Sequence, residues 1–166
     1  WITPEWTFSA RMRQGFLTVN NPRSGSSTPK ELNQSYTGYE AAIGYRLRFG
    51  SYGWSPYAEP QLGFMNHTFT SQDTSLSTFT GQTYTGLKFG VTGAAPLSAD
   101  GTYGVGGEFT MVFNANVKER PKTSGSDSDA HIVKFGVLGF KKLGERLKAQ
   151  MHLDFEMYSA TFSGTG

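Results

Sequence analysis

The sequence contains no cysteine, which excludes a disulfide framework, a thiolate metal site and a cysteine nucleophile. It also lacks any apolar run near the ~18 residues that a membrane-spanning helix needs, so helical membrane proteins are excluded. Charge of one sign is not in large excess, because 15 basic and 13 acidic residues leave a net charge of +2. That balance gives no electrostatic reason to expect a nucleic-acid partner. A membrane protein built from strands stays open, because there only every second residue must be apolar.

Alternation of apolar and polar residues with a period of two is the dominant pattern. Between residues 39 and 49, Ile43 and Leu47 belong to the apolar set, whereas Arg46 and Arg48 belong to the opposite set. No helix face fits this spacing. The same pattern predicts seven strands and no helix, with the strands at residues 7–16, 39–49, 57–68, 79–91, 103–117, 132–140 and 147–158.

The connections between these segments alternate in kind. Polar connections over residues 20–35, 70–78 and 118–129 follow the first, third and fifth strands, and connections over 50–56, 92–102 and 141–146 follow the others. The middle member of the second set, at residues 92–102, is longer than its two companions. This alternation predicts a single domain over residues 1–166, folded as an up-and-down antiparallel β-barrel.

The placement of charge indicates which face of the strands is inside. The non-apolar face carries long charged residues together with small glycines such as Gly44, Gly63 and Gly136. Glycine weakens a solvent-facing strand, whereas small residues inside a narrow barrel make room for long side chains. We therefore expect a lumenal charge network of Arg11, Arg13, Glu40, Arg46, Arg48, Glu59, Lys88, Glu108, Lys134, Lys148, His152, Asp154 and Glu156.

The apolar face is then expected to meet lipid. Amphipathic rings prefer the membrane interface, and several aromatic residues fall near the ends of the predicted strands. The expected interface aromatics are Trp6, Phe49, Trp54, Tyr57, Phe89, Tyr103, Phe113 and Phe155. The alternative is a soluble lipocalin-like barrel, in which the aromatic face would bind an apolar ligand and the charged face would meet water.

With this pattern the chain resembles the small bacterial outer-membrane β-barrels of the OmpA and OmpX type, from Trp6 to Tyr158. The resemblance is one of architecture and includes no family motif. It implies eight transmembrane strands, short turns and the N-terminus in the periplasm, long loops at the bacterial cell surface, contact with outer-membrane lipids and a removed signal peptide. Only seven strands are visible, so we expect a closing strand outside this sequence, pairing with another chain, or an unnoticed strand.

The lumenal charges suggest two functions. Side chains fill a barrel of about eight strands, so paired charges would plug the lumen and leave a structural or surface-interaction role. The alternative is a narrow porin-like conduit for small solutes that favours anions, because seven bases face five acids.

Catalytic and metal chemistry has weaker support. His152, Asp154 and Glu156 share a strand face, but nearby Lys and Arg already supply counter-charge, so we expect neither a metal nor a cofactor. A hydrolase or acyltransferase at the outer rim is an alternative, and its candidate catalytic residues are His67, Ser71, Asp73, Asp127, Asp129 and His131. Because no catalytic motif accompanies them, we expect no enzyme. Basic residues at Lys118, Arg120 and Lys122 could contact lipopolysaccharide.

Overall fold

The described residues of the computed structural model, 2–21, 30–71, 81–120, 127–144 and 147–163, form seven β-strands. The strands are 15 to 20 residues long, whereas five or six residues are typical of strands in globular proteins. The strands are β1 (Ile2–Asn21), β2 (Lys30–Phe49), β3 (Tyr57–Ser71), β4 (Gly81–Pro96), β5 (Tyr103–Arg120), β6 (Asp127–Lys142) and β7 (Lys148–Ser163).

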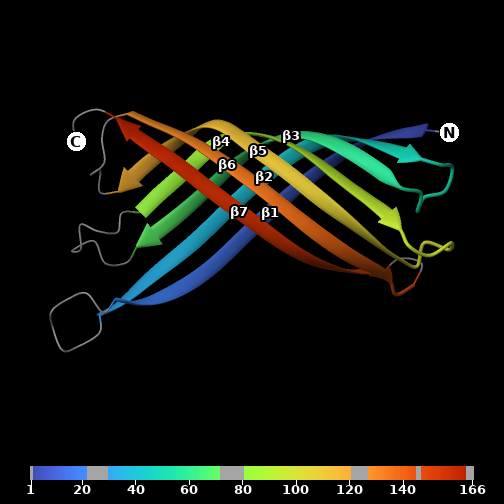
Figure 1. Cartoon of the computed structure of the whole chain (residues 1–166), viewed down its shortest axis with the longest axis horizontal. Helices are drawn as coiled ribbons and strands as arrows, with labels where there is room; N and C mark the ends of the chain where they lie inside the picture. The colour runs from blue at the N-terminus through green and yellow to red at the C-terminus, as the bar shows by residue number, and fades with distance from the viewer. Residues whose placement is uncertain (1, 22–29, 72–80, 121–126, 145–146, 164–166) are drawn as a thin grey trace.

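All seven strands belong to one antiparallel sheet in the order of the sequence. The sheet is strongly twisted and curls into a half-barrel, with the N-terminus and the C-terminus at opposite ends (Figure 1). The prediction of an all-β, up-and-down meander is confirmed. Because the number of strands is odd, β1 and β7 run in the same direction, and within the described residues each has only one strand neighbour.

The strands extend beyond the ranges that the alternation predicted. Residues 92–96 belong to β4, so the connection that was expected over 92–102 is shortened to residues 97–102. The strand continues here through small residues such as Gly93, Ala94 and Ala95, which carry no contrast between the two faces. Periodicity therefore detects the middle of each strand and misses its ends.

Backbone hydrogen bonds join the residues that flank three short connections at the end of the sheet where β2, β4 and β6 finish. The amide of Phe49 donates to the carbonyl of Pro56 (2.8 Å), that of Leu97 to Tyr103 (2.9 Å) and that of Leu143 to Leu147 (2.9 Å). Gly101 adopts a φ of 68° directly beside the Trp54 side chain, so the β4–β5 turn packs on the β2–β3 turn. These contacts fix one rim of the half-barrel, called the short-turn rim below.

A β-bulge reverses the facing of β5 near its middle. The register of β6 shifts between Val112 and Ala115, that of β4 shifts between Val112 and Asn116, and Asn114 has a φ of 52°. Asparagine tolerates this left-handed conformation better than most residues. The sequence pattern predicted that side chains alternate between the two faces without interruption over residues 103–117. This was wrong, because Ala115 and Val117 are buried on the same side as Val112.

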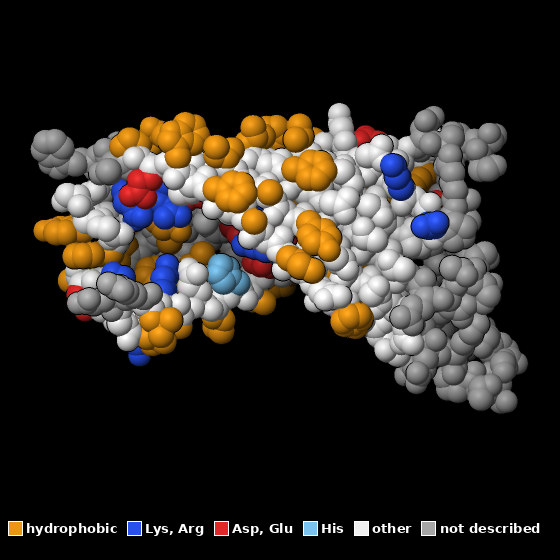
Figure 2. All heavy atoms as spheres, turned by 180° about the vertical axis from the view of Figure 1, so that it is seen from behind, with side chains coloured by type: hydrophobic (Ala, Val, Ile, Leu, Met, Phe, Trp, Pro, Cys, Tyr) orange, Lys and Arg blue, Asp and Glu red, His pale blue; other side chains and the backbone are white. Residues whose placement is uncertain are grey.

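Large apolar side chains point away from the concave side of the sheet. Phe8 and Met151 are each 79% exposed, and the same facing recurs on every strand, at Ile43, Leu62, Phe89, Phe109 and Val137. In the space-filling view, rows of hydrophobic side chains flank a hollow in which charged side chains are recessed (Figure 2). The described residues contain no helix that is long and apolar enough to cross a membrane.

The concave side holds a second group of residues that is apolar. It lies toward the ends of β5 and β7 and is closed by aromatic rings from β3, β4 and β7. We call it the apolar plug, and it consists of Met65, Phe69, Tyr84, Val112, Ala115, Val117, Ala130, Ile132, Tyr158, Ala160 and Phe162. The lumen is thus filled by charged side chains over one part of its length and by apolar side chains over another.

Candidate functional site: the charged lumen

Glu40 lies at the centre of the lumenal charges. Its strand, β2, presents it to the concave side together with Gly38 and Ala42, which are also buried. One carboxylate oxygen accepts a hydrogen bond from Lys88 of β4 at 2.6 Å, and the other lies 3.4 Å from Arg13 of β1. Because both partners are cationic, Glu40 is a buried charge with its compensation supplied by strands on either side.

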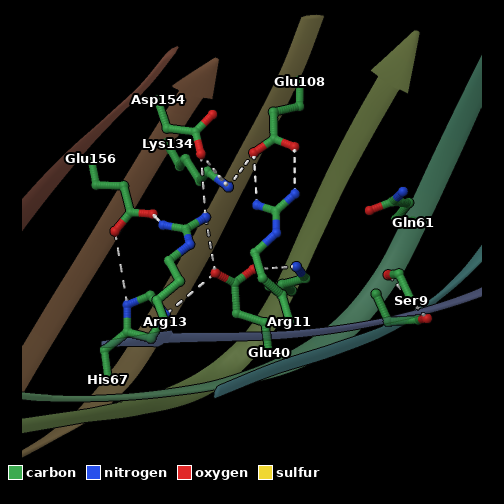
Figure 3. A network of polar contacts seen from close by, with 12 residues as sticks. Ser9, Arg11, Arg13, Glu40, Gln61, His67, Glu108, Lys134, Asp154 and Glu156 are labelled. Carbon is green, nitrogen blue, oxygen red and sulfur yellow. Dashed lines mark hydrogen bonds and ion pairs between the residues drawn. The ribbon is translucent and has the colours of Figure 1, made fainter. Parts of the chain in front are cut away.

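Arg13 connects the two edges of the sheet. Its guanidinium donates to Glu156 and lies 3.5 Å from Asp154, and both carboxylates belong to β7 (Figure 3). Glu40 of β2 is the third carboxylate near this guanidinium, so Arg13 contacts carboxylates from two strands. Strands β1 and β7 share no backbone pairing among the described residues, so side chains make the contact between them.

A second cluster centres on Glu108 of β5. Arg11 donates to both of its carboxylate oxygens at 3.3 Å, in the forked geometry of an arginine–carboxylate pair. Lys134 of β6 contacts Glu108 and lies 3.7 Å from Asp154, which links this cluster to the one around Arg13 (Figure 3). Lys134 is only 5% exposed, so its charge depends on these carboxylates.

Nearer the short-turn rim the pairs become local. Glu59 accepts hydrogen bonds from Arg46 (2.6 Å), Thr7 (2.8 Å) and Gln61 (2.8 Å), and its residue is 4% exposed. Arg48 donates to Glu5 at 2.9 and 3.1 Å, in a pair that is open to solvent.

His67 and Tyr158 belong to the network although they were not predicted to do so. His67 was expected at the outer rim, yet it is 2% exposed, and its Nδ1 lies 2.6 Å from the Tyr158 hydroxyl. Tyr158 donates in turn to Glu156 at 2.8 Å, so its oxygen accepts from His67. Every second residue of a strand faces the same side of the sheet. Counting in steps of two from Glu59 to His67, and from Glu156 to Tyr158, would therefore have placed His67 and Tyr158 inside.

On the short-turn side of the network the described residues line an open space. A cavity of about 320 Å³ is lined by residues that include Arg11, Glu59, Gln61 and His152. Between the network and the apolar plug only about 10 Å³ remains, next to His67, which is at the limit for one water molecule. At this level the described side chains of the network and of the apolar plug pack close together.

The structure places the thirteen predicted lumenal residues on the concave side, but it connects them unequally. Lys148 and His152 line cavities without an ion pair to any described residue, whereas the other eleven are paired. Of the three residues predicted to share a strand face, Asp154 and Glu156 contact Arg13 whereas His152 lines the cavity, and no group of three or more His, Asp or Glu side chains arranged to hold a metal ion is found among the described residues.

The aromatic residues that were expected at a membrane interface do not all lie outside. The ring of Tyr57 lines the lumen, 4.3 Å below the Arg46 guanidinium, and this corrects its assignment. Tyr57 shares strand parity with Glu59, so it faces inward. Phe89 and Phe155 face outward near the middle of their strands, whereas Trp6, Phe49, Tyr103 and Phe113 are exposed at other positions along the sheet. Trp54 lies in the β2–β3 turn, where it lines a cavity at the short-turn rim.

The rim residues considered for catalysis are not assembled into a reactive group. His131 is exposed and lies 3.6 Å from Asp129, while the neighbouring Ser128 hydroxyl donates to the Val117 carbonyl. His67 is buried in the network instead. Asp73 and the side chains of Ser71 and Asp127 lie outside the described part of the chain.

Comparisons of this chain with family models, curated proteins and solved structures found no match.

Proposed function

We propose that this protein is an integral β-barrel of a bacterial outer membrane, with a filled lumen and a structural or surface-interaction role. The observation that carries the proposal is the facing of the side chains. Glu40, Glu59, Lys88 and Lys134 are buried on the concave side, while the convex side exposes large apolar residues on every strand. A soluble protein rarely exposes so much contiguous apolar surface, whereas the hydrocarbon of a membrane requires it.

The lengths of the strands support the same conclusion. About 9–11 tilted residues cross the hydrocarbon of a bilayer, and the strands of this sheet are 15 to 20 residues long. The additional residues would extend into the aqueous phase at either side. This architecture is similar to that of OmpA-type and OmpX-type barrels.

In such a membrane the free edges of β1 and β7 would need a partner, because each unsatisfied backbone group in hydrocarbon costs several kcal/mol. A single strand antiparallel to both edges would close the barrel with eight strands. We propose that this strand comes from further polypeptide of the same protein or from another chain. Outer-membrane lipids, including lipopolysaccharide near Lys118 and Arg120, are the other expected partners.

The filled lumen favours anchoring over transport. The ion pairs and the apolar plug occupy successive parts of the concave side, so a conduit for small solutes would need these side chains to move apart. The lipocalin-like alternative is weakened because ion pairs occupy much of the concave side. The enzyme alternative is weakened because no hydrogen bond joins the His131 ring to a hydroxyl among the described residues, although Ser159 lies opposite it on β7.

Two experiments test this function. The protein expressed in a Gram-negative host should remain with outer membranes until detergent is added, and it should migrate differently on gels before and after boiling. A monomer that is stable in plain buffer contradicts the proposal. In planar bilayers the protein should be silent, whereas steady conductance that changes in an Arg46→Gln/Arg48→Gln variant would support the conduit instead.

A further inference from the structure

A second cavity, of about 390 Å³, opens at the short-turn rim. Its volume is within the range of pockets that bind small molecules. Its wall combines β2, the β2–β3 turn, β3, β4, β6 and β7, so residues far apart in the sequence converge on it. The lining includes Arg46, Arg48, Trp54, Tyr57, Lys142 and Lys148.

The charge of this lining is entirely positive. Four cationic side chains face the cavity, and no carboxylate residue lines it among the described residues. Arg46 and Arg48 are each paired with a carboxylate outside the cavity, Glu59 and Glu5. Lys142 and Lys148 form no ion pair with a carboxylate among the described residues; each of them lies over an aromatic ring instead.

Aromatic rings hold these two lysines at the wall. The ammonium of Lys142 lies 5.1 Å from the centre of the Trp54 ring, and that of Lys148 lies 4.2 Å from the centre of the Phe140 ring. A cation over an aromatic face is stabilised by only about 0.5–1 kcal/mol where solvent reaches it. Both ammonium groups are therefore available to an anion that offers stronger, charge-assisted hydrogen bonds.

We infer that this cavity is a binding site for a phosphate-bearing small molecule. The two ammonium groups of Lys142 and Lys148 match the charge of a phosphate monoester, and the guanidinium groups of Arg46 and Arg48 add donors suited to its oxygens. The rings of Trp54 and Tyr57 would lie against the organic part of the ligand. The inference does not depend on a membrane location, because it uses only the geometry of the rim.

Binding can be read from the fluorescence of Trp54. A Trp1→Phe/Trp6→Phe background leaves Trp54 as the single tryptophan of the chain. Inorganic phosphate and phenyl phosphate, titrated at low ionic strength into detergent-solubilised protein, should change its emission saturably, because an anion draws Lys142 away from the indole. Phenyl phosphate should bind more tightly than phosphate.

Matched lysine variants separate a site from general attraction to a basic surface. Lys142→Gln and Lys148→Gln should each weaken binding about tenfold, as expected for the loss of one charge-assisted hydrogen bond. Lys141→Gln is the control, because Lys141 is the exposed neighbour of Lys142 and does not line the cavity. It should change affinity by less than about twofold, since an exposed charge at that distance is largely screened.

Several results would overturn the inference. They are the lack of a saturable signal at millimolar phosphate, an equal change with sodium chloride at the same ionic strength, or an equal loss of affinity in the Lys141→Gln variant. Nanodiscs with and without phosphatidylglycerol distinguish two sources of the phosphate group. Competition by the anionic lipid would identify a lipid headgroup as the ligand, and its absence would identify a free phosphate ester.

Discussion

Replacing Arg13 by methionine should destabilise the folded protein strongly, because it removes the cation shared by three carboxylates. Glu156 is its direct partner, and Glu40 and Asp154 lie 3.4 and 3.5 Å from its guanidinium. Removing one partner of a buried ion pair typically costs about 3–5 kcal/mol. Arg13→Met should therefore lower the free energy of unfolding by an amount in this range.

The three carboxylates keep other partners in the Arg13→Met variant, so the expected loss in free energy of unfolding lies near the lower limit of this range. Glu40 keeps Lys88 at 2.6 Å, Asp154 keeps Lys134 at 3.7 Å, and Glu156 keeps the Tyr158 hydroxyl at 2.8 Å. We expect a loss of about 3 kcal/mol for Arg13→Met. A second substitution, Glu156→Gln, removes the carboxylate left without a cation and should restore about 1 kcal/mol.

Arg11→Met is the matched control. Arg11 lies two residues away on the same strand face and makes a forked pair with Glu108, but more than a third of its side chain is exposed. Glu108 also keeps Lys134 as a partner. The control should lose only about 1 kcal/mol, as expected for a partly exposed pair.

Urea unfolding in phospholipid vesicles, followed by tryptophan fluorescence and by gel mobility without boiling, measures all three variants. Equal losses for Arg13→Met and Arg11→Met would refute the reasoning, because burial and the number of carboxylates would then not matter. A double variant that is less stable than Arg13→Met alone would refute it as well.

Three further predictions concern packing and ionisation. Gly63→Ala should destabilise the fold by about 1–3 kcal/mol in the same unfolding assay, because its Cβ would overlap the Ala41 carbonyl oxygen. Gly15→Ala, whose Cβ would meet nothing closer than 3.9 Å, should be tolerated. Val112→Ala should cost about 2 kcal/mol by opening the apolar plug, and a loss below that of exposed Val105→Ala in detergent would contradict the burial. Hydrogen bonds from the Thr102 hydroxyl, Ser98 and the Thr102 amide lower the pKa of Asp100 to about 2 from its ordinary 3.8. The contribution of the Asp100 carboxylate to stability is thus present above pH 3.8 and lost as the pH falls through 2. An NMR titration of this carboxyl group with a midpoint near 4 would refute the lowered pKa.

The sequence was sufficient to predict the meander because seven segments keep a period of two. The same parity places Arg46 and Glu59 on the concave side and Leu62 and Leu153 on the convex side. The prediction lost accuracy where the two faces stop differing in polarity, as at residues 92–96 of β4.

Other features needed three-dimensional information. The bulge at Asn114 changes which residues of β5 are inside, and the sequence signals it only through one residue type that tolerates a positive φ. The pairing of Arg13 with Glu156 depends on the curl of the whole sheet, because the two residues are far apart in the chain and on strands that are not paired. Parity alone gives the face of each residue but not its partner.

The central claim is that lipid surrounds the apolar convex face while the charges occupy the lumen, and spin-label accessibility tests it most directly. The chain has no native cysteine, so Leu62→Cys and Gln61→Cys each give a single labelling site, at neighbouring residues with opposite facing. In vesicles the label at Leu62 should be relaxed by oxygen and shielded from a water-soluble nickel chelate, whereas the label at Gln61 should be shielded from oxygen dissolved in the lipid. Equal accessibility at the two sites, or strong relaxation of the Leu62 label by the nickel chelate, would contradict the account.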